Sequence, residues 1–282
     1  MQDLSAVQPI DRKVLKKARH KWELPLFTLC VALTVCAILL VGSLFIPMIA
    51  AEVENVEQER NSYLLLILAI PAITIGIMHY FYAKIRARSV RVTEKNFPEI
   101  YHKVEEFSKM LGLKKTPPVY IVQENGGLNA SAWGIIGKRW SSISAEIVDI
   151  AYMENKDFKP AYFILAHELG HIYLGHSSVT HALLVALGIK IPIFGPLFSR
   201  SREYSCDRIA QLLTNSDGFE EMMILSAGRH LYKYVDREDY LADKKDSGIA
   251  SFILNIQASH PLLPKRVAAL TDPEKKDGKL IW

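Results

Sequence analysis

Two long uncharged segments near the start of the chain are the features that most constrain its fold. Residues 24–51 hold 28 consecutive uncharged side chains, and residues 62–83 form a second uncharged run. A helix of 28 residues is about 42 Å long, which exceeds the roughly 30 Å hydrocarbon layer of a bilayer. Pro71, inside the second run, is tolerated in membrane helices. The pattern therefore predicts a transmembrane hairpin within residues 24–90.

The charges that flank these runs predict an orientation. Basic side chains are frequent in residues 1–23 and again between Lys84 and Arg91, whereas residues 52–60 carry four glutamates and one arginine. Positively charged flanks stay on the cytoplasmic side of a membrane. We therefore expect a multi-pass protein of the cell (inner) membrane, with the lipid bilayer as a partner and with both termini and residues 91–282 in the cytoplasm.

Composition argues against other classes of protein. The three cysteines, Cys30, Cys36 and Cys206, form no Cys-x-x-Cys pair, so neither a disulfide framework nor a cysteine zinc site is predicted. The net charge of +4 is small and the basic residues are scattered, which gives no support for nucleic-acid binding. No feature of the sequence indicates an oligomeric state.

The remaining residues, 91–282, show the pattern of a mainly helical α+β domain with a small sheet. Proline in the first turn and glycine after the last turn mark helix ends, and β-rich runs beside a Gly-Lys turn mark a hairpin. The elements expected in chain order are a helix at 97–112, a strand at 119–122, a hairpin of 133–136 with 139–144, and helices at 160–174 and 202–213.

A His-Glu-x-x-His motif lies in the helix expected at 160–174. Its histidines, His167 and His171, are four residues apart, a step that turns about 40° and leaves both imidazoles on one helix face. Imidazole nitrogens are common zinc ligands, and the neighbouring Glu168 can take a proton from an attacking water. The motif predicts a zinc site with Glu168 as general base.

Zinc needs a third protein ligand, and three residues are candidates. Glu203 and Asp207 lie four residues apart on one helix face, so Glu203 can bind the metal while Asp207 accepts a hydrogen bond from a ligating histidine. His176 lies about 180° away from His167 if the helix continues past the motif, and would then point away from the metal. His181, in a less certain turn region, is the weakest candidate.

Four segments together resemble the HtpX-like membrane zinc metallopeptidases, a gluzincin family related to the prenyl-protein endopeptidases. The resemblance covers about residues 95–270 and the two uncharged runs. The segments are, in chain order, Asn129-Ala130-Ser131-Ala132-Trp133-Gly134, His167-Glu168-Leu169-Gly170-His171, Ser199-Arg200-Ser201-Arg202-Glu203-Tyr204-Ser205-Cys206-Asp207, and His260-Pro261 with Arg266.

The resemblance implies a zincin-type fold, one Zn²⁺ per chain and a role for each segment. Arg266 would brace the site or pair with a surface acid. The other implied roles are zinc binding by His167, His171 and Glu203, base catalysis by Glu168, support of a ligating histidine by Asp207, oxyanion stabilisation by His260, and substrate pairing along an edge strand at Asn129, Ala130, Ala132 and Gly134.

The implied activity is hydrolysis of peptide bonds, with membrane or misfolded proteins as the polypeptide partners and quality control as the role. One alternative is cleavage within the bilayer, but the charged residues between Asp149 and Lys159 place the start of the motif helix in water or at the interface. Another is a non-catalytic membrane scaffold, against which the intact Glu168 argues.

The apolar segment 181–198 lies where HtpX itself has two further hydrophobic segments. It is too short, and too broken by Pro192 and Pro196, to predict another membrane span. Two interpretations remain open. The segment forms a hydrophobic flap on the inner leaflet, with Lys190 reaching the headgroups, or it forms a buried helix of the catalytic core.

Overall fold

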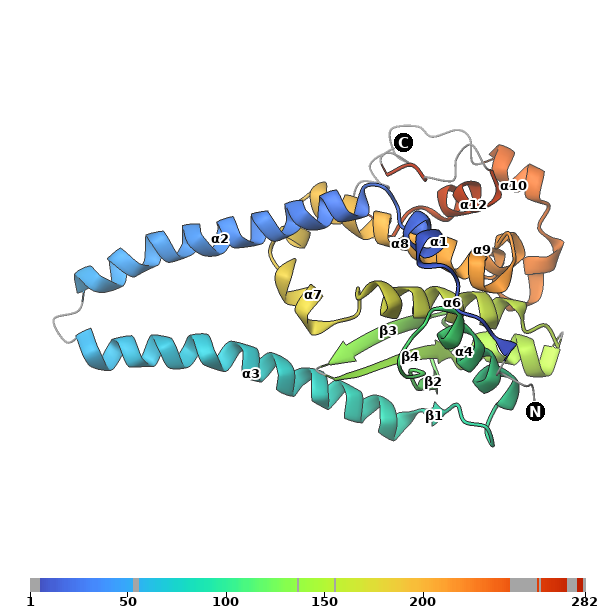
Figure 1. Cartoon of the computed structure of the whole chain (residues 1–282), viewed down its shortest axis with the longest axis horizontal. Coiled ribbons are helices and arrows are strands. Elements are labelled where there is room, and N and C mark those ends of the chain that lie inside the picture. The colour runs from blue at the N-terminus through green and yellow to red at the C-terminus, as the bar shows by residue number, and fades with distance from the viewer. Residues whose placement is uncertain are drawn as a thin grey trace.

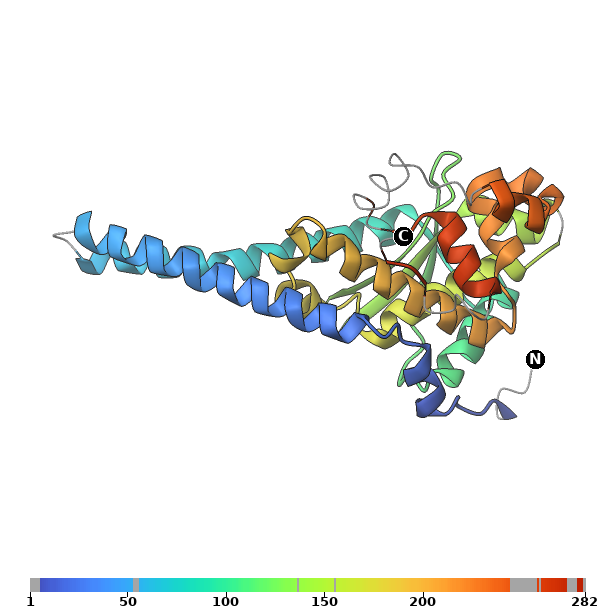
Figure 2. The same cartoon turned by 90° about the horizontal axis from the view of Figure 1, so that it is seen from above.

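Both uncharged runs are helical, and the two helices that contain them project in the same direction from the rest of the molecule and diverge toward it (Figures 1 and 2). Helix α2 spans Glu23–Glu52 and helix α3 spans Val56–Arg88. The computed structural model describes residues 6–52, 56–135, 137–154, 156–243, 258, 260–272 and 278–280. Residues 53–55, which belong to the predicted outside turn, lie outside these ranges.

One helical segment in the described ranges, Glu23–Leu44, is long and apolar enough to cross a membrane. Only 11% of its most apolar stretch is buried inside the protein, so most of that surface is free to contact lipid. Large apolar side chains of α2 such as Leu39 and Leu44 are exposed, as are Ile73 and Phe81 of α3. The second membrane span stays a prediction.

The rest of the chain forms the expected α+β arrangement, mostly helical around one small sheet. Helices α5 and η2 are a short α-helix and a π-helical turn, and η3 and η4 are single 3₁₀ turns. In chain order the remaining helices are α1 (Arg12–Ala18), α4 (Pro98–Met110), α5 (Ala145–Asp149), η2 (Ile150–Glu154), α6 (Lys159–Leu174), α7 (Val179–Leu184), η3 (Gly188–Lys190), α8 (Phe194–Thr214), α9 (Phe219–Leu231), η4 (Tyr232–Tyr234), α10 (Arg237–Asp243) and α12 (Leu263–Thr271).

The sheet has the strand order β1-β2-β4-β3. Strands β2 and β4 are parallel, whereas β1 pairs with β2 and β3 pairs with β4 in antiparallel fashion. Their bounds are β1 Val90–Arg91, β2 Val119–Val122, β3 Ala130–Ile135 and β4 Lys138–Ser144. The order leaves β3 as an edge strand of the sheet.

Helix α6 lies between the sheet on one side and α8 on the other, and α12 packs on α8 and α9 (Figure 1). Phe163 and Leu165 of α6, Ile143 of β4 and Ile209 of α8 are buried in the same hydrophobic core. Burying large apolar side chains contributes about 1.5–3 kcal/mol each. This shared core fixes the distance between α6 and α8, the two helices that carry the predicted metal ligands.

The predicted elements are all present, and the helix expected at 160–174 is α6 to within one residue. The strand expected at 119–122 is β2 with the same bounds, and the expected hairpin is β3 with β4, although Ile136 lies outside the described residues. The helix expected at 202–213 begins earlier, at Phe194, as part of α8. Its first turns therefore belong to the apolar segment 181–198.

The segment 181–198 is distributed over the end of α7, the η3 turn and the start of α8, and is not one helix. Val185 and Phe198 are buried against Cys30 of α2, whereas Leu184 and Phe194 are exposed. The alternative of a single buried helix does not hold, because Gly188 and Pro192 lie between α7 and α8, and the chain is not one helix there. Contact of this segment with lipid stays a prediction.

Candidate metal centre and catalytic cleft

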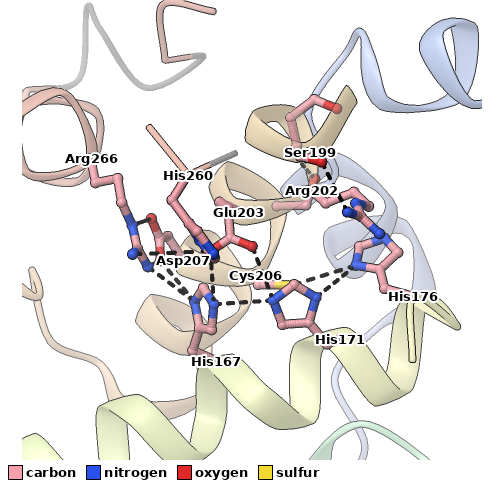
Figure 3. A network of polar contacts seen from close by, with 12 residues as sticks. His167, His171, His176, Ser199, Arg202, Glu203, Cys206, Asp207, His260 and Arg266 are labelled. Atoms are coloured by element: carbon pink, nitrogen blue, oxygen red, sulfur yellow. Dashed lines mark hydrogen bonds and ion pairs between the residues drawn. The ribbon is translucent and has the colours of Figure 1, made fainter. Parts of the chain in front are cut away.

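The His-Glu-x-x-His motif lies in the second half of α6, directly against α8. A Cβ added to Gly170 would lie 3.3 Å from Cα of Cys206, which is tighter than ordinary van der Waals contact. Glycine at this position therefore lets the backbones of α6 and α8 approach closely. The close approach brings Glu203 and Asp207 of α8 to the histidines of α6 (Figure 3).

Three potential ligand atoms meet between the two helices. Nε2 of His167 is 3.2 Å from Nε2 of His171, and each of these nitrogens is 3.4 Å from an oxygen of Glu203. Ligand atoms at the roughly 2.0–2.1 Å bond lengths of tetrahedral zinc lie about 3.4 Å from one another. These three side chains therefore fit Zn²⁺, both in donor type and in spacing.

The opposite nitrogen of His167 is also engaged. Its Nδ1 is 2.8 Å from Oδ1 of Asp207, and Arg266 of α12 donates from Nε to Oδ2 of Asp207 at 2.8 Å. A carboxylate accepts, so Nδ1 carries the hydrogen and Nε2 keeps the lone pair that a metal requires. The position of Asp207 agrees with the predicted supporting role, and Arg266 pairs with this buried acid, not with a surface acid.

The electrostatics of the site favour a cation. Burial raises the pKa of Glu203, but its contacts with His167, His171 and His260 outweigh burial and hold the pKa well below the usual value. Burial lowers the pKa of His167, yet hydrogen bonds to Asp207 and Glu203 raise it to about 10. The carboxylates thus stabilise positive charge at the place where three ligand atoms converge.

A cavity of about 230 Å³ opens beside these ligands. His167, Glu168 and Glu203 line it, and Glu168 is only 7% exposed. Burial raises the pKa of Glu168. A carboxylate with a raised pKa is suited to take up a proton and release it again near neutral pH.

Apolar side chains form much of the remaining wall of the cavity. Ile147, Phe163 and Ile164 lie on one part of the wall, and Met222 and Leu225 come from α9. Such a lining can accept an apolar side chain of a bound polypeptide next to the proposed base. The cavity therefore has room and chemistry for part of a substrate.

The predicted substrate strand is β3, and only its first part reaches the cavity. Asn129, just before β3, and Ala130 line the cavity, whereas Ala132 and Gly134 are absent from its lining. A Cβ added to Gly134 would lie 2.7 Å from the carbonyl oxygen of Ser177, so glycine is needed there for close backbone packing. Of the four predicted residues, Asn129 and Ala130 therefore lie at the cavity, and Ala132 and Gly134 lie further along the edge strand.

His260 lies at the mouth of the cavity. Its Nδ1 is 3.0 Å from Oε2 of Glu203, and its side chain is 67% exposed. A histidine that contacts a candidate metal ligand and also faces solvent can reach a substrate bound in the cavity. The structure thus brings His260 to the candidate site, although it follows Glu203 by 57 positions in the sequence.

His176 does not lie where the sequence predicted. Helix α6 ends at Leu174 because Gly175 adopts a left-handed conformation with φ of 82°. The chain then turns back, and Nδ1 of His176 lies 3.1 Å from Nδ1 of His171. The expected end of the helix at Leu174 is confirmed. The continuing helix assumed for His176 was wrong, because the left-handed Gly175 turns His176 back toward His171.

His181 takes no part in the cluster of ligand atoms. Its ring stacks on Phe27 of α2 and on Phe198 of α8, at centroid distances of 5.2 and 5.7 Å. Cys206 is buried and its Sγ lies 3.7 Å from Nδ1 of His176. Glu23, the first residue of α2, also reaches this region, which sequence reasoning missed because a contact over 153 positions leaves no local pattern.

The fold and this site define a metallopeptidase, and comparison with protein families agrees. The model of peptidase family M48 matches residues 94–274, so the chain belongs to peptidase family M48. Members of this family are zinc metallopeptidases. The resemblance to HtpX-like metallopeptidases inferred from the motifs is thereby confirmed.

Two curated relatives carry the name "Protease HtpX homolog". The protein from Halobacterium salinarum is 39% identical over 79 residues, which cover 28% of this chain and 25% of that relative. The protein from Fusobacterium nucleatum subsp. nucleatum is 26% identical over 216 residues, which cover 61% of this chain and 68% of that relative. Both similarities point to a protease.

Proposed function

We propose that this protein is a membrane-anchored, zinc-dependent endopeptidase that hydrolyses peptide bonds in membrane or misfolded proteins. The observation that carries the proposal is the convergence of His167, His171 and Glu203 at tetrahedral spacing beside Glu168 and a substrate-sized cavity. In this proposal those three residues bind one Zn²⁺ per chain, and Asp207 orients His167.

When bound, Zn²⁺ supplies Lewis-acid chemistry, since it polarises the scissile carbonyl and lowers the pKa of the attacking water. Glu168 takes a proton from that water as its oxygen attacks the carbonyl carbon. The same carboxyl then delivers the proton to the amine that leaves when the C–N bond breaks. His260 donates a hydrogen bond to the oxygen that becomes negative, and because Nδ1 contacts Glu203 we assign this donation to Nε2.

A polypeptide substrate would bind as an extended strand along β3. An edge strand offers its backbone for pairing, and such pairing demands little of the substrate sequence. Asn129 and Ala130 would hold the part of the substrate nearest Glu168, with Ala132 and Gly134 further along the same strand. Low sequence demand suits an enzyme that removes misfolded proteins.

The variant Glu168→Gln tests the proposal directly. The amide keeps the shape of the side chain but cannot take up the proton, so hydrolysis of an unfolded protein by the detergent-solubilised enzyme should fall by at least about 100-fold. Zinc content, measured by elemental analysis, should stay at one ion per chain. Turnover close to that of the unchanged protein would remove Glu168 as the base.

The membrane part of the proposal rests on α2 and on the surface beside it. Leu183, Leu184, Leu187, Ile193 and Phe194 are all exposed, on or between α7, η3 and α8, which pack against α2. Apolar side chains grouped in this way favour contact with the inner leaflet, where the cleft would meet membrane proteins.

In this proposal α2 and α3 both span the cell membrane, with both termini and the catalytic domain in the cytoplasm. The basic flanks of the two uncharged runs support that orientation. A reporter enzyme fused after residue 282 should be active only in its cytoplasmic form. A reporter active only outside the cytoplasm would overturn the orientation and leave the chemistry of the site untouched.

A further inference from the structure

We propose that Glu23, at the start of the membrane helix α2, is a positioning residue for the metal centre and acts on His171 through His176. This inference rests on the proposed function, because it takes His171 as a zinc ligand. It adds two residues, His176 and Glu23, to the machinery that holds the metal. Because Glu23 belongs to α2, the geometry of the site would also depend on how α2 packs on the rest of the protein.

The three side chains form a continuous chain of contacts, and Figure 3 shows the part of it between His171 and His176. Nδ1 of His171 is 3.1 Å from Nδ1 of His176, and Nε2 of His176 is 3.0 Å from Oε1 of Glu23. His176 is 9% exposed and Glu23 is 3% exposed. Contacts at these distances between buried groups are hydrogen bonds, shielded from competition by water.

Only one assignment of hydrogens satisfies all of these contacts with a neutral His176. The carboxylate of Glu23 can only accept, so Nε2 of His176 carries the hydrogen and donates it. Nδ1 of a neutral His176 then has a lone pair and accepts from Nδ1 of His171. As a result, Nε2 of His171 keeps its lone pair, and this is the nitrogen that faces His167 and Glu203. The chain therefore selects the tautomer of His171 that can bind a metal.

Local structure places His176 in this position. Gly175 ends α6 in the left-handed conformation, and the backbone N–H of His176 donates to the carbonyl oxygen of His171 at 2.9 Å. The imidazole of His176 thus folds back beneath the last turn of the motif helix. A residue with a Cβ at position 175 would be strained at this φ.

Glu23 is itself held firmly. Nε of Arg19 is 2.9 Å from its Oε1, and the hydroxyl of Ser205 donates to Oε2. Ser205 also accepts from the backbone N–H of His20 at 2.8 Å. Because Ser205 lies on α8, two positions after the third ligand Glu203, the same helix fixes both ends of the chain of contacts.

A second metal ion is the alternative explanation for this cluster. His171, His176 and Cys206 also place three ligand atoms close together. A metal there would have to share the imidazole of His171 with the first ion. Burial also raises the pKa of the Cys206 thiol well above its usual value, which disfavours the thiolate that a metal needs. The hydrogen-bonded chain explains the contacts without either requirement.

The test uses the full-length protein in detergent and measures zinc affinity by competition with a chelator. His176→Leu keeps the volume of the side chain but can neither accept nor donate, and it should weaken zinc affinity about 10- to 100-fold. His176→Gln can accept through its oxygen and donate through its nitrogen, so it should recover most of that loss. His102→Leu is the control, since His102 lies on α4, 3.8 Å from Glu105, and away from this chain of contacts. The zinc affinity of that variant should not change.

A double-mutant cycle tests the role of Glu23. Glu23→Gln should weaken zinc affinity by less than about tenfold, because the amide oxygen still accepts from His176. In the His176→Leu background the same change should have no further effect on affinity, since the path to His171 is already broken. Independent, additive effects would show that Glu23 does not act through His176 and would overturn the proposal.

Other outcomes separate this inference from the proposed function. If His176→Leu fails to fold, Glu23→Gln in the otherwise unchanged protein still decides the question, since a loss of zinc affinity supports the positioning role and unchanged affinity overturns it. Unchanged zinc affinity in a folded His176→Leu protein, or two zinc ions per unchanged chain, would overturn the positioning role while leaving the peptidase intact. Absence of zinc from the unchanged protein, or full activity of Glu168→Gln, would instead contradict the proposed function itself.

Discussion

The two histidines of the His-Glu-x-x-His motif have different hydrogen-bond partners, although the motif gives both the same predicted role. His167 contacts a carboxylate directly, since its Nδ1 lies 2.8 Å from Asp207, and Arg266 holds that carboxylate from α12. His171 contacts another imidazole, that of His176, at 3.1 Å. A negative charge therefore touches the first ring, whereas a neutral ring touches the second.

These different partners should give the two imidazoles different strengths as metal ligands. A carboxylate in direct contact raises the basicity of His167 more than a carboxylate one ring away can raise that of His171. The two supports also come from opposite parts of the chain, Arg266 from the C-terminal helix α12 and Glu23 from the start of α2. In the proposed site, the support of both histidines therefore requires that these two remote segments pack on α8.

The largest effect in this comparison is expected from Glu203, which both histidines share. Glu203→Ala removes the oxygens that lie 3.4 Å from each ring and should reduce zinc occupancy at limiting metal to a small fraction, with loss of hydrolysis. Glu221→Gln is the control, because Glu221 is another buried glutamate of the cavity wall and contacts neither histidine. Full zinc occupancy in Glu203→Ala would remove Glu203 as a ligand.

The carboxylates of Asp207 and Glu23, which support His167 and His171, can be compared by neutralising each in turn. Asp207→Asn should weaken zinc affinity about 10- to 100-fold, more than Glu23→Gln, because it removes the negative charge in direct contact with His167. It also leaves the buried guanidinium of Arg266 without its acid. Chelator competition on both variants measures the difference, and equal losses would show that the supports are equivalent.

The sequence predicted the parts of the site that depend on local spacing. The four-residue steps from His167 to His171 and from Glu203 to Asp207 each place two side chains on one helix face, and the helices are present. The strand at 119–122 was also predicted with its observed bounds, since β-rich runs between turn residues are local signals too.

The parts that the sequence did not predict depend on a turn or on a long-range contact. The position of His176 follows from one backbone conformation, at Gly175, which redirects the chain after the motif. The role assigned to Glu23 needs the packing of α2 on α8, and its sequence neighbourhood shows only an acid at the edge of an apolar run. The spacing of apolar residues along the chain predicts neither the turn at Gly175 nor the packing of α2 on α8.

The smallest effect is expected from substitution of Cys206. This substitution distinguishes the two explanations for the contacts around His171, which are a chain of hydrogen bonds and a second metal ion. Its Sγ lies 3.7 Å from Nδ1 of His176, a distance compatible with a weak contact. If hydrogen bonds alone support His171, Cys206→Ser should change zinc affinity by no more than about twofold and leave one zinc per chain. Serine keeps the size of the side chain and also tolerates the tight approach of Gly170.

The absorption spectrum of Cys206→Ser with Co²⁺ in place of Zn²⁺ tests more directly whether Cys206 binds a metal. A thiolate ligand gives Co²⁺ a strong charge-transfer absorption in the near ultraviolet, which imidazole and carboxylate ligands do not give. If His167, His171 and Glu203 are the ligands, the unchanged protein and Cys206→Ser should therefore have the same cobalt spectrum. A near-ultraviolet band that disappears in Cys206→Ser would make Cys206 a ligand, and the asymmetry between His167 and His171 would then arise from a second metal and not from their hydrogen-bond partners.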